Sequence, residues 1–218
     1  MKTVFYVVRH GQSVGNLNAL FLGQTDLDLS ELGYKQADAT AKALADIHFD
    51  AIYSSDLLRA YNTAVPHAKL RGLPIITDQD LREINIGEWE GLHRDEIIEK
   101  YGDLFILGWR QQYGTFTAPG GESVYGAGLR FHNAMAKIGD ENVGKCVLVT
   151  AHASVIRTFY AITLSIPPER IADEVSFPSN ASYSIFEYED GKFTPISYSN
   201  DDHMGDLVTY IIEDGKRV

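Results

Sequence analysis

The sequence predicts an α/β fold: a mostly parallel central sheet flanked by helices on both faces, with a small helical lid. Three observations support this prediction. Four short apolar runs are typical of strands that a parallel sheet buries on both sides. Segments with helical spacing alternate with these runs. Near the end, Asp190-Gly191 between two β-rich stretches indicates a hairpin. The four apolar runs are residues 4–8, 51–53, 75–76 and 146–150.

The first two helices are expected around the second apolar run. Ser30 can cap an amphipathic helix that continues to Ile47. A second helix should begin at Ser54 or Ser55. Pro66 lies inside this second pattern, where a proline costs ~3 kcal/mol or more. We therefore expect the second helix to kink or to stop early at Pro66.

A lid is expected where the alternation of strands and helices is interrupted. Residues 92–101 and 103–112 indicate two short helices separated by Gly102. They fall within an insertion at about 88–122, which ends in a glycine-rich loop. The helices expected later in the chain cover residues 124–138 and 155–164.

Composition favours one compact domain over residues 1–218 and an ordinary globular protein, with 44% apolar and 22% charged residues. Acidic residues outnumber basic ones by 30 to 19, which disfavours binding to nucleic acid or to an anionic membrane. No stretch approaches the ~20 apolar residues of a membrane span. The first apolar run is too short for a signal-peptide core. We therefore expect a cytoplasmic enzyme, and the sequence sets no oligomeric state.

Polar side chains capable of chemistry follow each of the four predicted strands. Because the carboxyl ends of parallel strands meet at one edge of a sheet, these side chains should converge on one rim. Arginine offers a planar fork of donors that suits phosphate. Histidine can act as a nucleophile or as an acid and base near neutral pH. In chain order, the side chains are Arg9 with His10, then Arg59, Glu83 and His152.

These segments resemble the histidine phosphatase (phosphoglycerate mutase-like) superfamily, and its phosphatase branch in particular. A triplet of Arg9, His10 and Gly11 alone would be a weak signal, but the resemblance extends over most of the chain, from about residue 3 to 199. The matching blocks stand in family order at family spacing. They are residues 9–16, 23–26, 55–64, 81–91, 121–123 and 152–157.

The resemblance implies a phosphomonoester hydrolase that acts on small phosphorylated metabolites through a phosphohistidine. His10 would be the nucleophile. Glu83 would protonate the leaving oxygen and then serve as the base for water, since the two half-reactions run in opposite senses. The neighbouring carboxylates Glu88, Glu90 and Glu122 compete with Glu83 for this role.

The resemblance also implies a phosphate-binding set. Backbone contacts to the substrate are expected at Gly23 and Ala153. Arginines can carry the phosphate charge, and no histidine–carboxylate spacing suits a metal, so neither a metal nor a cofactor is expected. The expected partner is a small phosphorylated substrate. The side chains expected to bind phosphate are Arg9, Asn16, Arg59 and His152.

The sequence departs from the common family pattern at two places that bear on function. Ala153 and Ser154 stand where the family often has two glycines. Gly15 precedes Asn16, whereas the mutase branch typically has a Trp-Asn pair at this position. The long basic insertion of that branch is also absent. These departures favour a phosphatase over the alternative, a phosphoglycerate mutase-type phosphotransferase.

Other interpretations remain open at this point. Residues 11–15 spell the G-x-S-x-G elbow of serine hydrolases, with Ser13 as the nucleophile of an esterase. A catalytically inactive phosphate sensor on the same fold is a third class. Glu83 could also form a surface salt bridge with Arg82 instead of acting in catalysis.

Overall fold

A six-stranded sheet organises the fold, in the order β3-β2-β4-β1-β5-β6. The computed structural model describes residues 1–210, 212–213 and 216–217. The first four strands of this order are parallel, and β5 pairs antiparallel with β1 and β6, so the sheet is mostly parallel as expected. The strands are β1 (Thr3–Arg9), β2 (Ala51–Ser54), β3 (Ile75–Thr77), β4 (Cys146–Ala151), β5 (Tyr183–Glu189), β6 (Lys192–Asn200) and a separate pair, β7 (Ile212–Glu213) with β8 (Lys216–Arg217).

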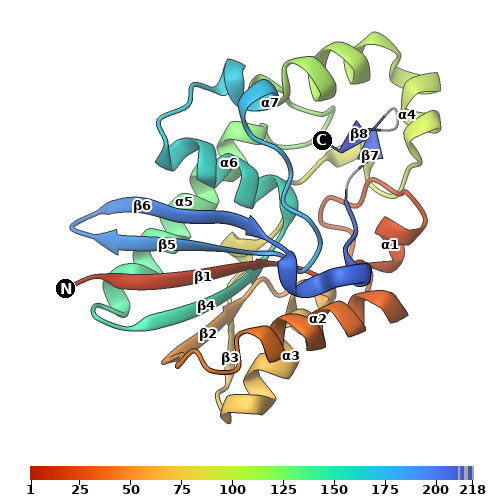
Figure 1. Cartoon of the computed structure of the whole chain (residues 1–218). Coiled ribbons are helices and arrows are strands. Elements are labelled where there is room, and N and C mark those ends of the chain that lie inside the picture. Colours follow the sequence, from red (N-terminus) through yellow and green to blue (C-terminus); the bar gives the residue numbers. More distant parts are fainter. Residues whose placement is uncertain (211, 214–215, 218) are drawn as a thin grey trace.

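Helices cover both faces of the sheet. Figure 1 shows α5 and α6 on one face and α2 and α3 on the other. The expected helices are present, with ends that differ by a few residues. The α-helices are α1 (Val14–Leu17), α2 (Glu31–Ala43), α3 (Leu58–Arg71), α4 (Arg94–Tyr101), α5 (Val124–Glu141), α6 (Ala153–Thr163) and α7 (Ile171–Glu174).

The alternation of side chains along β1 explains the two helical layers. Phe5 and Val7 pack into one apolar cluster with residues of α5 and α6, whereas Val8 belongs to a second cluster beneath α2 and α3. Successive strand residues point to opposite faces, so a run that is apolar at every position is buried on both sides. All three side chains are at most 1% exposed, as the sequence predicts for a central strand.

The start of α3 differs from the expectation. The helix begins at Leu58 and not at Ser54 or Ser55. The chain is still paired in the sheet there, because Ser55 N–H donates to the carbonyl of Thr150 and the Ser54 carbonyl accepts from Asp78 N–H. Sheet pairing thus uses backbone groups that a helix would need.

Pro66 neither ends α3 nor stops it early, since the helix continues to Arg71. The turn beyond the proline is held by tertiary contacts. Arg71 donates to the carbonyls of Leu44 and Ile47, and its guanidinium lies 4.6 Å from the centre of the Phe49 ring. These contacts offset the hydrogen bond that the proline removes.

The segment expected to form a lid contains two short helical pieces separated by Gly102, as predicted. The first is α4, and the second is a π-helical turn at Leu104–Gln111. Gly102 has φ of 51°, a left-handed conformation that suits glycine. In Figure 1 this segment lies above the carboxyl ends of the parallel strands. Its aromatic side chains pack onto the core through Trp89, which is fully buried.

The predicted hairpin joins β5 and β6 at Asp190-Gly191. Both turn residues have positive φ, 51° and 78°, as a two-residue hairpin turn requires. β6 forms one edge of the sheet and contains Pro195, and the three-residue β3 forms the other edge. In the described part of the chain, no helix has the length and apolar character needed to cross a bilayer.

Gly33 lets α2 pack against the loop that follows β1. A Cβ atom at Gly33 would lie 2.0 Å from the carbonyl oxygen of Gln12. We expect Gly33→Ala to lower the free energy of unfolding by about 1–3 kcal/mol, the usual cost of overpacking, despite the better helix propensity of alanine. Urea unfolding measures this loss.

The matched control is Lys35→Ala, an exposed position on the same helix, which should change stability by less than about 0.5 kcal/mol. If Gly33→Ala proved as stable as Lys35→Ala, close packing of α2 would not hold the end of β1 in place.

Candidate active site

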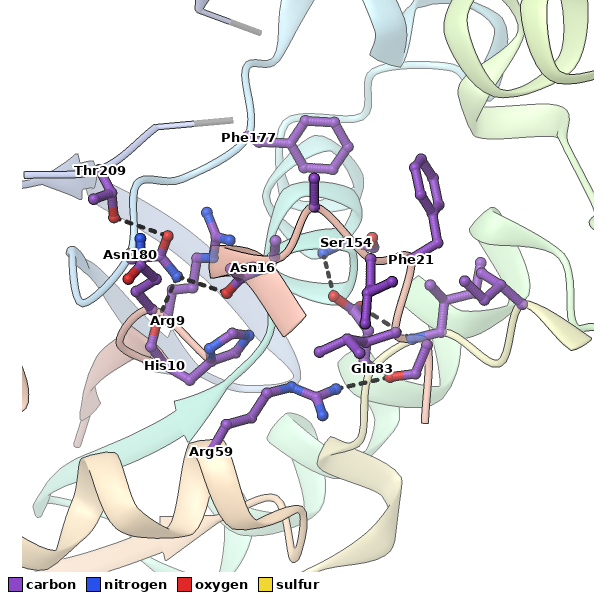
Figure 2. A pocket seen from close by; sticks show the side chains of 18 of the residues that line it. Arg9, His10, Asn16, Phe21, Arg59, Glu83, Ser154, Phe177, Asn180 and Thr209 are labelled. Atoms are coloured by element: carbon purple, nitrogen blue, oxygen red, sulfur yellow. Dashed lines mark hydrogen bonds between the residues drawn. The ribbon is translucent and has the colours of Figure 1, made fainter. Parts of the chain in front are cut away.

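A pocket of about 310 Å³ opens at the rim of the sheet, where the predicted site residues meet. Figure 2 shows Glu83 across the pocket from Arg9 and His10. His152 does not line the pocket; it is fully buried beside His10, with ring centres 5.1 Å apart. The predicted residues that line the pocket are Arg9, His10, Asn16, Gly23, Arg59, Glu83 and Ala153.

The hydrogen bond of His10 decides which ring nitrogen is reactive. Its Nδ1 atom lies 2.7 Å from the carbonyl oxygen of Gly11. Because a carbonyl only accepts, Nδ1 carries the proton and Nε2 keeps its lone pair. Burial, together with the charges of Arg59 and Arg9, holds the pKa of His10 well below 6.5. His10 is therefore a neutral imidazole whose Nε2 can act as a nucleophile at neutral pH.

His152 is neutral for similar reasons. Burial, followed by the charge of Arg59, holds the pKa of His152 well below 6.5. Its Nε2 lies 2.8 Å from Ser55 Oγ, which also accepts from Leu57 N–H at 3.3 Å. The serine hydroxyl can donate its hydrogen to Nε2, and in that arrangement the His152 proton is on Nδ1. That Nδ1 atom is buried and has no partner among the described residues, so it can donate to a ligand.

Two buried guanidinium groups give the pocket its positive charge. Arg9 and Arg59 are 2% and 1% exposed, and neither forms a salt bridge among the described residues. Arg59 donates to the carbonyls of Gly23 at 2.7 Å and Thr25 at 2.8 Å, and Arg9 donates to the carbonyl of Pro178 at 2.5 Å. Burial lowers the pKa of Arg9 to about 10, so this side chain stays charged at neutral pH.

Glu83 is held at the N-terminus of α6. Its Oε1 accepts from the backbone N–H groups of Ile84 at 3.0 Å and Val155 at 3.3 Å, and its Oε2 accepts from Ser154 N–H at 3.2 Å. The free N–H groups of a first helical turn attract an anion. Three backbone donors therefore fix the Glu83 carboxyl group at the pocket.

The proposed salt bridge between Arg82 and Glu83 is wrong. Arg82 donates through Nε and Nη2 to the two oxygens of Asp56, at 2.6 and 2.5 Å. A two-bond contact of this kind matches the fork of arginine to a carboxylate. Arg82 is therefore paired with Asp56, and Glu83 lines the pocket without it.

Two of the competing carboxylates have structural partners outside the pocket. Glu90 accepts from Gln24 N–H at 2.9 Å and from the Thr25 hydroxyl at 3.0 Å, and so fixes the loop that holds Arg59. Glu88 is exposed and accepts from the Tyr101 hydroxyl at 2.7 Å. Neither carboxylate lines the pocket.

Glu122 supports the segment that carries Glu83. Its Oε1 accepts from Asn85 N–H at 2.8 Å and from Arg130 at 2.7 Å. Arg130 also donates to the carbonyls of Asp80 and Glu83, at 2.8 and 3.2 Å. This pair clamps the backbone on both sides of Glu83, and among the four candidates only Glu83 reaches the pocket.

Gly23 and Ala153 contribute backbone to the pocket wall. Gly23 has φ of 52°, and a Cβ there would lie 2.4 Å from Glu90 Oε1, so the position requires glycine. Its carbonyl is one of the two that accept from Arg59. Ala153 is the first residue of α6 and is 6% exposed.

Asn16 reaches the pocket from α1. Its Oδ1 accepts from Ser13 N–H at 3.1 Å and from the Asn180 side chain at 3.3 Å, which leaves its amide nitrogen for a ligand. Asn180 also donates to the carbonyl of His10 at 3.1 Å, so it ties α1 to the end of β1.

The serine esterase interpretation is wrong. Ser13 is fully buried, and its Oγ accepts from Asn16 N–H at 3.1 Å as the N-cap of α1. A nucleophile elbow presents its hydroxyl exposed above the sheet. Ser13 does not line the pocket, so the G-x-S-x-G match reflects a helix cap.

Sequence reasoning missed three residues that shape this site. Ser55 directly follows β2, so attention to strand ends could have assigned it as the partner of His152. Asn180 and Phe177 lie in the irregular stretch before β5, where no periodicity marks them, yet both line the pocket.

The arrangement suits transfer of a phosphoryl group. Two fixed cations can balance a phosphate dianion, a neutral histidine can attack it, and a carboxyl group stands opposite to exchange a proton. Among the described residues, no three or more His, Cys, Asp or Glu side chains gather where they could hold a metal ion.

Known proteins resemble this chain in both sequence and fold. A phosphoglycerate mutase of Cytophaga hutchinsonii that depends on 2,3-bisphosphoglycerate is 36% identical over 173 residues, which cover 78% of this chain and 81% of the mutase. Phosphoserine phosphatase 1 of Hydrogenobacter thermophilus is 31% identical over 202 residues, 92% of this chain and 94% of that enzyme. A mycobacterial glucosyl-3-phosphoglycerate phosphatase, solved with VO3, superposes with a TM-score of 0.82 at 29% identity, and the match covers 91% of this chain and 99% of that one.

The family itself follows from a match along nearly the whole chain. The model of the histidine phosphatase superfamily (branch 1) matches residues 5–201, a span that includes every residue of the pocket discussed above. With that match and the relatives' identities, the chain belongs to the histidine phosphatase superfamily.

Proposed function

We propose that this protein hydrolyses small phosphomonoesters through a phosphohistidine at His10. The observation that supports this most directly is the state of His10: a neutral ring with an unprotonated Nε2, beside two buried arginines. Glu83 is the carboxyl group of the pocket and stands across from it.

In the first half-reaction, Arg9, Arg59 and Asn16 bind the phosphoryl oxygens, and Nδ1–H of His152 donates to them. A bond forms between His10 Nε2 and phosphorus as the bond from phosphorus to the ester oxygen breaks. Protonated Glu83 gives its proton to that oxygen, so the alcohol leaves neutral.

In the second half-reaction, a water molecule attacks phosphorus and the bond to His10 Nε2 breaks. The Glu83 carboxylate takes the proton of the water and returns to its starting state. Orthophosphate leaves, and His10 is again neutral. No net electron transfer occurs, so the cycle needs no redox cofactor, and Arg9 and Arg59 supply the charge stabilisation.

The remaining parts of the proposal concern setting and architecture. The enzyme works without a metal ion, in the cytoplasm, where phosphorylated metabolites are found. The chain acts as one domain, and the insertion at 88–122 serves as a lid, a role supported by Arg94 and Trp109, which line the pocket from this segment.

A mutase activity is the second candidate, and the identity to the Cytophaga hutchinsonii mutase favours it. A mutase must hold a second anionic group of the sugar acid while the phosphoryl group is on the histidine. Apart from Arg9 and Arg59, the pocket wall offers one cation, Arg94, among the described residues. The phosphatase therefore fits this pocket better.

His10→Ala should lower turnover by at least about 10³-fold, the scale seen when a covalent nucleophile is removed. Brief reaction with ³²P-labelled substrate in EDTA, followed by denaturation, should trap label on wild-type protein that is labile in acid and stable in base. The His10→Ala protein should carry none. The matched control, Ser13→Ala, should still be labelled.

Three results would count against this proposal. Label on an oxygen would exclude the phosphohistidine, loss of labelling in EDTA would exclude the metal-free cycle, and absence of both label and turnover would indicate an inactive phosphate sensor.

Glu83→Gln should slow release of alkyl alcohols by roughly 10²–10⁴-fold, the usual worth of a positioned acid. Release of 4-nitrophenol should fall far less, since that leaving group departs without much proton help. Single-turnover measurements of alcohol release isolate the first half-reaction. Glu88→Gln, an exposed carboxylate on the same segment, is the control and should match wild type. Equal losses on both esters would mean that Glu83 is structural.

With 3-phosphoglycerate, phosphate release should exceed conversion to 2-phosphoglycerate, and 2,3-bisphosphoglycerate should not be needed. The reason is the shortage of cations around the pocket beyond the phosphoryl site. ³¹P NMR of the reaction mixture follows both products at once. Interconversion that outruns phosphate release and depends on the bisphosphate would establish the mutase instead.

A further inference from the structure

The part of the pocket away from the phosphoryl site is lined by large apolar side chains. Figure 2 shows the rings of Phe21 and Phe177 on the side of the pocket away from Arg9, His10 and Arg59. They come from segments that are distant in sequence. We call this surface the apolar wall; it consists of Leu20, Phe21, Ile84, Ile86, Trp109 and Phe177.

The apolar wall is a rigid extension of the core. Phe21 packs edge-on against Trp109 with ring centres 5.5 Å apart, and Trp109 packs in the same way against Tyr113 at 5.1 Å. Phe177 also packs edge-on against Tyr113, with ring centres 5.3 Å apart. Aromatic side chains fixed in this way lose little freedom when they bind a ligand, and the water against them is displaced favourably by an apolar group.

The two cations at the phosphoryl site match the charge of the phosphoryl group, and Arg94 is the one further cation that lines the pocket among the described residues. Arg9 and Arg59 balance a phosphate dianion, while His10 and His152 are neutral. A carboxylate on the leaving group would add a third negative charge against the apolar wall, inside a protein of net charge −11.

We propose that the substrates of this enzyme are phosphate monoesters of apolar alcohols, aliphatic or aromatic, whose carbon skeleton lies on the apolar wall. This inference rests on the proposed phosphatase function and names its substrate class. A pocket of about 310 Å³ limits the alcohol to a small one.

A series of straight-chain alkyl phosphates from methyl to hexyl tests the inference. Their alcohols have nearly equal basicity, so the demand on Glu83 stays constant along the series. We expect kcat/KM to rise about three- to fourfold per methylene until the pocket is full. Hexyl phosphate should then be hydrolysed with a higher kcat/KM than O-phosphoserine or 3-phosphoglycerate.

A charge placed in the apolar wall should reverse this preference. Leu20→Lys should lower the ratio of kcat/KM between hexyl and methyl phosphate and raise kcat/KM for O-phosphoserine. The matched control is Leu17→Lys, the same change at a 62% exposed position on α1 outside the pocket, and it should keep the wild-type series. Activity gained on O-phosphoserine cannot result from misfolding.

The outcomes separate this inference from the function it rests on. A flat alkyl series, or faster hydrolysis of O-phosphoserine that Arg94→Met abolishes, would overturn the apolar substrate class while leaving the phosphatase in place. No hydrolysis of any ester, together with no label on His10, would overturn the proposed function itself.

Discussion

The chemistry of this protein depends on two arginine cations buried next to two histidines. Burial and the positive field of Arg9 and Arg59 keep His10 and His152 uncharged. Backbone carbonyls hold the two guanidinium groups. Among the described residues, no carboxylate forms a salt bridge with either of them. Their positive charge is therefore available to a ligand, because a close ion pair with a carboxylate would have neutralised it within the protein. The rest of the site exists to keep these cations in place without neutralising them.

The scaffold meets this requirement through loops that are locked to one another. The Gly23 loop holds Arg59 and is itself fixed by Glu90, and the backbone around Glu83 is clamped by Glu122 and Arg130. Glu90 and Glu122 both support the backbone of the site, whereas Glu83 lines the pocket. Glu88, Glu90 and Glu122 accept hydrogen bonds outside the pocket, so among the described residues Glu83 is the one carboxylate that lines it.

Much of the fold could be predicted because β-strands buried on both sides leave a continuous apolar signal, as in β1 and β4. His10 and His152 could be predicted because they directly follow β1 and β4, and Arg59 and Glu83 because they lie in the segments after β2 and β3. The start of α3 could not, since sheet pairing continues to Ser55 through partners far along the chain. The positions of Asn180 and Phe177 in the pocket could not be predicted either, because tertiary contacts of an irregular segment place them there. The aromatic residues of the segment 88–122 form a sequence pattern that core packing alone would also produce, so the pattern did not reveal that Trp109 lines the pocket.

The two edge strands of the sheet affect how readily copies of this chain pair with each other. An open edge strand can recruit a strand of another molecule and so begin aggregation. One edge here is β3, with three residues, and the other is β6, which Pro195 deprives of a backbone donor at mid-strand. Neither edge offers a long row of matched donors and acceptors. The parallel strands that build the catalytic rim are therefore shielded from a hazard that grows with protein concentration and during folding, when edges are most accessible.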